Sequence, residues 1–139
     1  MKLRIHKDSI RFRFTREEAR ALSEGMVLAE HVAVGPLAEQ QLSYRVVPDG
    51  PGPISVAFAD NTISVFVPQA ELLDWYEGEI LALETTQNWS GGQVRVMLEK
   101  DLQRLNPKPG DEPKGVYSHP LFGVKGMRIL RLLAVRKAP

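Results

Sequence analysis

The chain has 139 residues, of which 43% are hydrophobic and 25% charged, and a formal net charge of +1 at pH 7. These proportions are typical of one globular domain that buries its own core. The absence of cysteine excludes disulfides, zinc–thiolate sites and thiol nucleophiles. No apolar run approaches the roughly 18 residues of a membrane span, and the chain opens without a secretory signal pattern. We therefore expect a single cytoplasmic domain over residues 1–139 with no membrane partner.

The first elements in chain order are a hairpin and a helix. Apolar and charged residues alternate over residues 2–6 and 10–14, which predicts two amphipathic strands. In the stretch that follows, Thr15 can cap a helix, Glu18 completes a capping box, and Gly25 supplies the stop. A short helix is therefore expected directly after the hairpin.

Two more strands are expected in MVLAEHVAVG and QLSYRVV, before the breaker PDGPGP at residues 48–53. After the breaker the same order returns. A hairpin has its turn at Asp60-Asn61, a helix begins at Pro68 and ends at Gly78, and two strands cover residues 80–85 and 94–98.

A constant offset of 53 residues aligns the two halves, placing Ile10 on Ile63, Glu18 on Glu71 and Gly25 on Gly78. We interpret this as an internal duplication. The predicted fold is α+β: a ββαββ unit present twice, with a mostly antiparallel sheet, two short helices and a pseudo-twofold. Repeat 1 covers residues 1–52, repeat 2 residues 53–105, and a C-terminal extension residues 106–139.

Charge divides the extension from the body. Residues 1–113 carry 12 basic and 17 acidic residues, a net of −5, whereas residues 114–139 carry 6 basic residues and no acid. The favoured interpretation is a tail that docks on its own domain; the alternative is a basic arm for an anionic partner. Residues 125–139 fit helix and strand almost equally, and we favour a strand at a sheet edge.

The phase of the apolar residues gives the expected core, in which Trp75 is a packing residue. Its members are Leu3, Ile5, Ile10, Phe12, Phe14, Leu22, Leu28, Tyr44, Val56, Phe58, Ile63, Val65, Val67, Leu72, Trp75, Leu81, Val94, Val96 and Leu98.

Several stretches together resemble a family of small uncharacterised bacterial proteins, a domain of unknown function. They are MKLRI with SIRFRFT, the helix start REEARAL, ISVFVP with Trp75 nearby, and LEKDL at residues 98–102. The resemblance covers roughly residues 1–120. The family pattern has a Cys-Leu pair after the last motif, where this chain has Arg104-Leu105, which argues against an essential thiol. The resemblance implies a bacterial cytosolic protein and no particular activity.

Motifs for catalysis and metal binding are weak. His6, His31 and His119 are isolated in the sequence, and no phosphate-binding loop or nucleophile motif is present. Glu99, Lys100 and Asp101 resemble a solvated strand end that forms ion pairs more than an acid/base cluster. We assign no catalytic residue, no metal and no cofactor.

The first hairpin carries the candidate site. With its turn at Lys7-Asp8, the apolar residues share one face, and the other face pairs Arg4 with Arg11 and Lys2 with Arg13. Like charges in opposition cost stability, and the second hairpin places Ala57/Ser64 and Ser55/Phe66 at the same positions. The scaffold therefore does not require these four cations.

The first hypothesis is a non-enzymatic binding module for an anionic small molecule or acidic protein surface, with Lys2, Arg4, Arg11 and Arg13 as its site. The alternative for the cluster is neutralisation by Glu30, Glu84 or Glu99 from adjoining strands. A single-stranded nucleic-acid-binding sheet is the second functional hypothesis, although only Phe66 offers a stacking surface. A polyphosphate-processing enzyme with an antiparallel tunnel is the third. The oligomeric state is left open.

Overall fold

The computed structural model describes residues 1–102, 115–117 and 135–137. The predictions made for other residues, His119 and Arg104-Leu105 among them, lie outside this part of the chain. Two helices are present, α1 Arg16–Ser23 and α2 Gln69–Glu77. The strands are β1 Lys2–His6, β2 Ser9–Phe14, β3 Leu28–Ala33, β4 Gln41–Asp49, β5 Ser55–Ala59, β6 Thr62–Pro68, β7 Ala82–Trp89, β8 Gly92–Lys100 and β9 Val135–Lys137.

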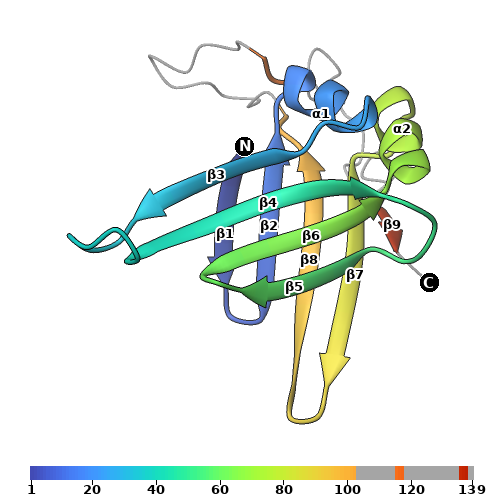
Figure 1. The fold of residues 1–139 in the computed structure, drawn as a ribbon. Helices are drawn as coiled ribbons and strands as arrows, with labels where there is room; N and C mark the ends of the chain where they lie inside the picture. The colour runs from blue at the N-terminus through green and yellow to red at the C-terminus, as the bar shows by residue number, and fades with distance from the viewer. Residues whose placement is uncertain (103–114, 118–134, 138–139) are drawn as a thin grey trace, which may run out of the picture.

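The strands form two sheets that cross one another, and both helices lie at the same end (Figure 1). Sheet A has the order β1-β2-β8-β7-β9 and sheet B the order β3-β4-β6-β5. Each hairpin is antiparallel, while β2 with β8, β4 with β6 and β7 with β9 pair in parallel. The predicted α+β class with mostly antiparallel pairing is confirmed.

Each sheet combines one hairpin from each half of the chain. The first hairpin of the N-terminal half joins the second hairpin of the C-terminal half in sheet A, and the two remaining hairpins form sheet B. The order hairpin, helix, hairpin occurs twice, as the sequence predicted. The exchange of hairpins between sheets was not predicted, because strand periodicity carries no information about which edges meet.

The helices begin and end where the sequence signals predicted. The Thr15 side chain accepts from the Glu18 backbone amide, and the Glu18 side chain accepts from the Thr15 amide, which completes the capping box. Gly25 follows α1 with a φ of 91°. Pro68 precedes α2, and Gly78 is its C-cap residue.

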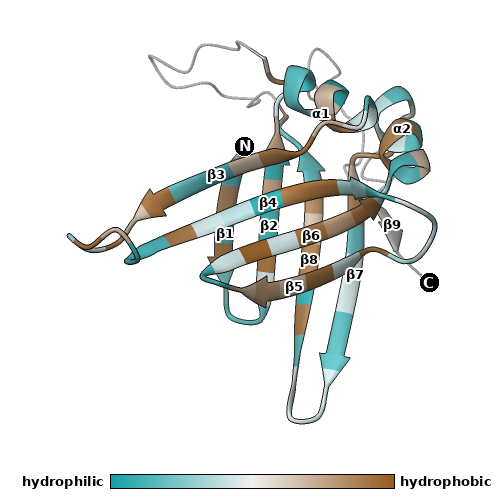
Figure 2. Cartoon of the chain, in the orientation of Figure 1, coloured by the Kyte–Doolittle hydropathy of each residue, from teal (hydrophilic) through white to brown (hydrophobic). Residues whose placement is uncertain are grey.

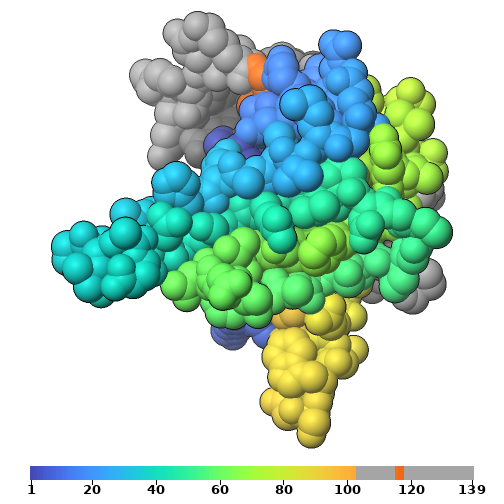
Figure 3. Space-filling model, viewed as in Figure 1, coloured from blue at the N-terminus to red at the C-terminus, as the bar shows by residue number. Residues whose placement is uncertain are grey.

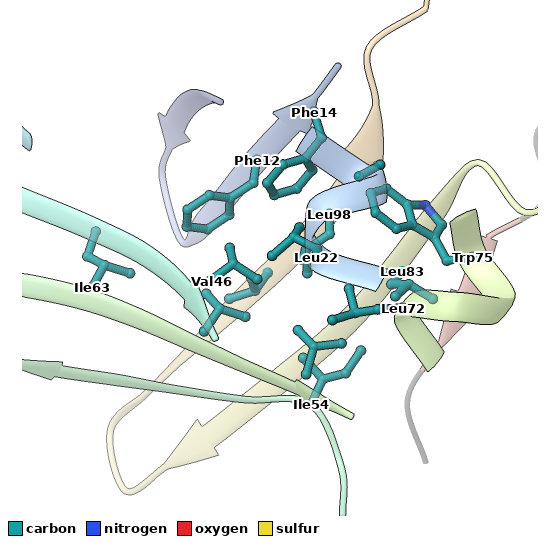
Figure 4. Packing of buried hydrophobic residues seen from close by; sticks show 14 residues of the cluster. Phe12, Phe14, Leu22, Val46, Ile54, Ile63, Leu72, Trp75, Leu83 and Leu98 are labelled. Carbon is teal, nitrogen blue, oxygen red and sulfur yellow. The ribbon is translucent and has the colours of Figure 1, made fainter. Parts of the chain in front are cut away.

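The core lies between the sheets beneath the helices, where Phe14 meets Trp75 edge-on at 5.7 Å between ring centroids (Figure 4). Ten members of the expected core are buried there: Phe12, Phe14, Leu22, Ile63, Val65, Val67, Leu72, Trp75, Val96 and Leu98. Four more members of this core cluster were not predicted: Ala19, Val46, Ile54 and Leu83.

The expected core was wrong at the end of the molecule away from the helices. Ile5 and Phe58 are 55% and 67% exposed, although both lie on the inner faces of their sheets. Seven other members are only partly buried: Leu3, Ile10, Leu28, Tyr44, Val56, Leu81 and Val94. Both helices lie at one end, so the inner faces are less covered toward the hairpin turns (Figure 1).

Sheet B is tied to sheet A along β5. The Gln87 side chain on β7 accepts from the Val56 amide at 3.0 Å and donates to the Val56 carbonyl at 2.9 Å. The Gln87 side-chain amide thus satisfies backbone groups of β5 that a neighbouring strand would otherwise pair with at this sheet edge. Beyond this contact the β7–β8 hairpin projects past sheet B, with the hydrophilic end of β7 coloured teal in Figure 2.

The tail contributes β9 at the edge of sheet A, where Val135 pairs with Ala82 and Lys137 with Glu84. We expected an edge strand in residues 125–139, and residues 135–137 form one. Among the described residues no helix is long and apolar enough to cross a membrane.

Candidate anion site on the first hairpin

The first hairpin has the expected register, with Lys2 opposite Arg13 and Arg4 opposite Arg11. Both turns are also where we placed them, since Lys7, Asp60 and Asn61 have φ values of 51°, 51° and 55°. Because side chains alternate along a strand, the four cations share the outer face of sheet A, opposite the core face.

Three of the four cations lie within 4.0 Å of a carboxylate. Lys2 Nζ lies 2.7 Å from Asp101 Oδ2, and Arg13 Nε lies 3.2 Å from Glu99 Oε2. Arg11 reaches the other oxygen of Glu99 at the longer distance of 3.9 Å. Glu99 stands on β8 directly opposite Arg13 in the parallel pairing, so one carboxylate serves both arginines. The cluster is therefore partly neutralised.

Of the three acids named in the alternative interpretation, Glu30, Glu84 and Glu99, only Glu99 contacts the cluster. Glu84 pairs with Arg95 of β8, and Glu30 accepts from the amine of Met1 at 3.0 Å. Asp101 was not predicted as a partner. Strand alternation could have identified it, because Asp101 follows Glu99 by two residues and so shares its face.

Arg4 and Arg11 form the open part of the cluster. Together with His6 and Ser9 they line a hollow of about 90 Å³ on the outer face. Ser9 Oγ donates to the His6 carbonyl at 2.8 Å, which ties the two strands together beside the hollow. Within the described part of the chain, no carboxylate lies within 4.0 Å of the Arg4 guanidinium. Positive charge therefore concentrates at this hollow.

The strand end at residues 99–101 forms ion pairs as expected, but it is not solvated. Lys100 and Asp101 are each only 7% exposed. Lys100 Nζ donates to the Gly78 carbonyl at 2.8 Å, where a cation stabilises the end of α2. Burial lowers the pKa of Lys100, and the nearby charge of Arg16 lowers it further. This segment joins the end of β8 to α2 and β1.

The histidines that the structure describes lie in different sheets, His6 on β1 and His31 on β3. Across residues 1–102, 115–117 and 135–137, no three His, Cys, Asp or Glu side chains are grouped so that they could hold a metal ion.

Comparison with known proteins gives a family but no activity. No curated protein and no solved structure matches the chain. The model of a family of unknown function, DUF7009, matches residues 1–121. Two stretches that carry the family resemblance, SIRFRFT and LEKDL, lie side by side in the fold because β2 pairs with β8. The chain belongs to this family of unknown function.

Proposed function

We propose that the protein is a non-enzymatic binding module that receives an anionic group on the outer face of the β1–β2 hairpin. The anion is a phosphate or carboxylate on a small molecule or on an acidic protein surface. Arg4 and Arg11 would bind it directly. Lys2 and Arg13, whose charges are already balanced by Asp101 and Glu99, would contribute long-range attraction.

The observation that carries this proposal is the Arg4–Arg11 pair: among the described residues Arg4 has no carboxylate within 4.0 Å, and Arg11 has only the more distant Glu99, which it shares with Arg13. Two guanidinium groups held opposite one another on a rigid hairpin repel, and the cost is on the scale of the ~0.2–1 kcal/mol assigned to cross-strand pairs. An anion between them would remove this repulsion and accept several charge-assisted hydrogen bonds. The hollow of about 90 Å³ is small, which favours a single anionic group over a large ligand.

Nucleic acid fits this surface less well. Single strands are held by aromatic stacking in addition to charge. The outward residues of β1 and β2 are Lys2, Arg4, His6, Ser9, Arg11 and Arg13, which include no Phe, Tyr or Trp. The third hypothesis, a tunnel enzyme, would need a polar lining between the sheets, whereas residues such as Phe12, Val46 and Val65 fill that space.

The evolutionary part of the proposal is that the two ββαββ units arose by duplication and are related by a pseudo-twofold. The repeated element order and the matching strand orders of sheet B and of the first four strands of sheet A support it. The bacterial and cytoplasmic setting implied by the family resemblance is also part of the proposal.

Thermal unfolding in phosphate, acetate and chloride at fixed ionic strength tests the anion site. A ligand present at ten times its Kd that binds only the folded state stabilises it by roughly 1.4 kcal/mol, which raises the Tm by about 5 °C in a domain of this size. We expect inorganic phosphate to raise the Tm of the unmodified chain and to raise it much less in Arg4→Gln.

The matched control is Arg20→Gln. Arg20 is an exposed arginine on α1 whose partner, Glu24, lies on the same helix surface. This variant should respond to phosphate as the unmodified chain does. Equal responses of Arg4→Gln and Arg20→Gln, or no response to any anion, would contradict the proposal. A steep fall of oligonucleotide affinity with salt, together with no phosphate response, would favour nucleic acid.

A further inference from the structure

A second and larger hollow lies on the outer face of sheet B, the face turned toward the reader in Figure 3. Its volume is about 480 Å³, within the size range of small-molecule sites. It crosses all four strands, on the opposite side of sheet B from the core. It shares no lining residue with the Arg4–Arg11 hollow.

The hollow exists because small side chains stand next to one another across the strands. Ala57 of β5 pairs with Ser64 of β6, which pairs with Arg45 of β4. One step along the strands, Ala59 pairs with Thr62 and Thr62 with Ser43. A floor of alanine and hydroxyl residues lets a ligand approach the backbone closely, and the longer side chains of Arg45, His31 and Phe66 also line the hollow.

Arg45 is held in a fixed orientation. Its Nε donates to Ser64 Oγ at 2.8 Å, and Ser64 is only 5% exposed. Among the described residues, no carboxylate lies within 4.0 Å of this guanidinium, and its Nη donors have no partner there. A guanidinium fixed through Nε presents its remaining edge to a carboxylate, which it can bind through two parallel hydrogen bonds.

An aromatic ring stands beside this cation. Phe66 follows Ser64 by two residues on β6 and pairs with Val47, two residues beyond Arg45. It therefore shares the outer face with Arg45 and lies diagonally across from it, and its ring is half-buried in the lining of the hollow. A planar ring bound there would stack on Phe66.

The other end of the hollow has the opposite charge. Asp60, in the β5–β6 turn, lines it beyond Ala59 and Thr62. Glu30 of β3, which accepts from the Met1 amine, is a second acidic residue of the lining. A ligand with a second anionic group reaching this end would be repelled. The hollow thus suits one negative charge at Arg45, which favours a carboxylate over a polyphosphate.

We infer that this hollow on the outer face of sheet B binds a small planar aromatic carboxylate, with the carboxylate on Arg45 and the ring against Phe66. This site is separate from the Arg4–Arg11 hollow, since the two lie on the outer faces of different sheets. Either site can therefore fail without the other.

Isothermal titration with 2-naphthoate tests the inference. We expect 2-naphthoate to bind, and both 2-naphthol, which lacks the charge, and acetate, which lacks the ring, to bind at least tenfold more weakly. No measurable binding of 2-naphthoate to the unmodified chain would overturn the inference.

Three variants locate the binding. Arg45→Gln removes the charge and should weaken 2-naphthoate at least tenfold, whereas Arg4→Gln should leave its affinity unchanged. Ala57→Leu fills the groove from an exposed edge strand and should abolish binding while circular dichroism remains unchanged, which covers the case that Arg45→Gln fails to fold.

Equal loss in Arg4→Gln would place the ligand on sheet A and overturn the inference. Full affinity in Ala57→Leu would also overturn it. Binding of a single-stranded oligonucleotide that depends on Phe66, with none of 2-naphthoate, would replace it with a base-binding sheet.

Discussion

The hairpins β1–β2 and β5–β6 occupy corresponding places in the two sheets but carry opposite kinds of outer surface. Each turns through residues with positive φ, and each pairs in parallel with a strand from the other half of the chain. In sheet A the hairpin is cationic, and the neighbouring strand supplies the carboxylate of Glu99. In sheet B the two strands of the hairpin carry no charged residue, and the neighbouring strand supplies the cation of Arg45.

The inner faces of the two hairpins are much more alike. Phe12 and Val65, which correspond at the 53-residue offset, are both fully buried, and Ile5 and Phe58 are both more than half exposed. Position along the sheets thus fixes burial in the same way in each hairpin. The fold constrains the inner faces, and the outer faces are free to differ, so the differences between them are the best guide to function.

The largest expected effect tests whether position along the sheet, and not residue type, decides how deeply an inner-face side chain is buried. Phe12→Ala should lower the free energy of unfolding by about 3–5 kcal/mol, the usual cost of removing a buried phenylalanine. Phe58→Ala removes the same atoms from an exposed site, and should change it by less than about 1 kcal/mol. Urea denaturation measures both. Comparable losses would mean that Phe58 is covered in solution.

A smaller effect is expected where the two free hairpin edges differ. The β5 edge is capped by the Gln87 side chain, whereas the outward side chains of the β1 edge are Lys2, Arg4 and His6. Gln87→Ala removes two hydrogen bonds to Val56, each of which contributes ~0.5–1.5 kcal/mol. We therefore expect the free energy of unfolding to fall by about 1–3 kcal/mol. Amide hydrogen exchange should speed up at Val56 and not in β1. Unchanged exchange at Val56 would show that the cap contributes nothing.

The smallest effect separates Arg4 from Arg13 on the first hairpin. Arg4→Glu faces Arg11 and meets no carboxylate among its described neighbours, so the free energy of unfolding should stay equal or rise by roughly 0.2–1 kcal/mol. Arg13→Glu faces Glu99 and should lower it by a similar amount. Both are measured by urea denaturation. A destabilising Arg4→Glu would show that Arg4 is already paired with an acid, and we would then withdraw the hairpin site.

Much of the candidate site could be predicted from the sequence. The pairing of Arg4 with Arg11 followed from the requirement that Leu3, Ile5, Ile10 and Phe12 share a face. The ion pairs that Lys2 and Arg13 form with carboxylates could not be predicted from the sequence alone. They depend on β8 pairing in parallel with β2 in one particular register. The groove around Arg45 had no local signal, since its residues come from four strands between residues 29 and 66.

The sequence by itself determined the local elements: the capping box at Thr15 and Glu18, the ends of both helices at glycine, and the hairpin turns at Lys7-Asp8 and Asp60-Asn61. These depend on backbone preferences and contacts only a few residues apart. Only the tertiary structure decided which hairpins share a sheet, that Ile5 and Phe58 stay exposed, and that Glu99 and Asp101 reach the cations. The shared sheet and the ion pairs follow from parallel pairing of β2 with β8, more than eighty residues apart, and periodicity within one strand cannot encode such pairing. The exposure of Ile5 and Phe58 follows from the position of both helices at the other end of the sheets.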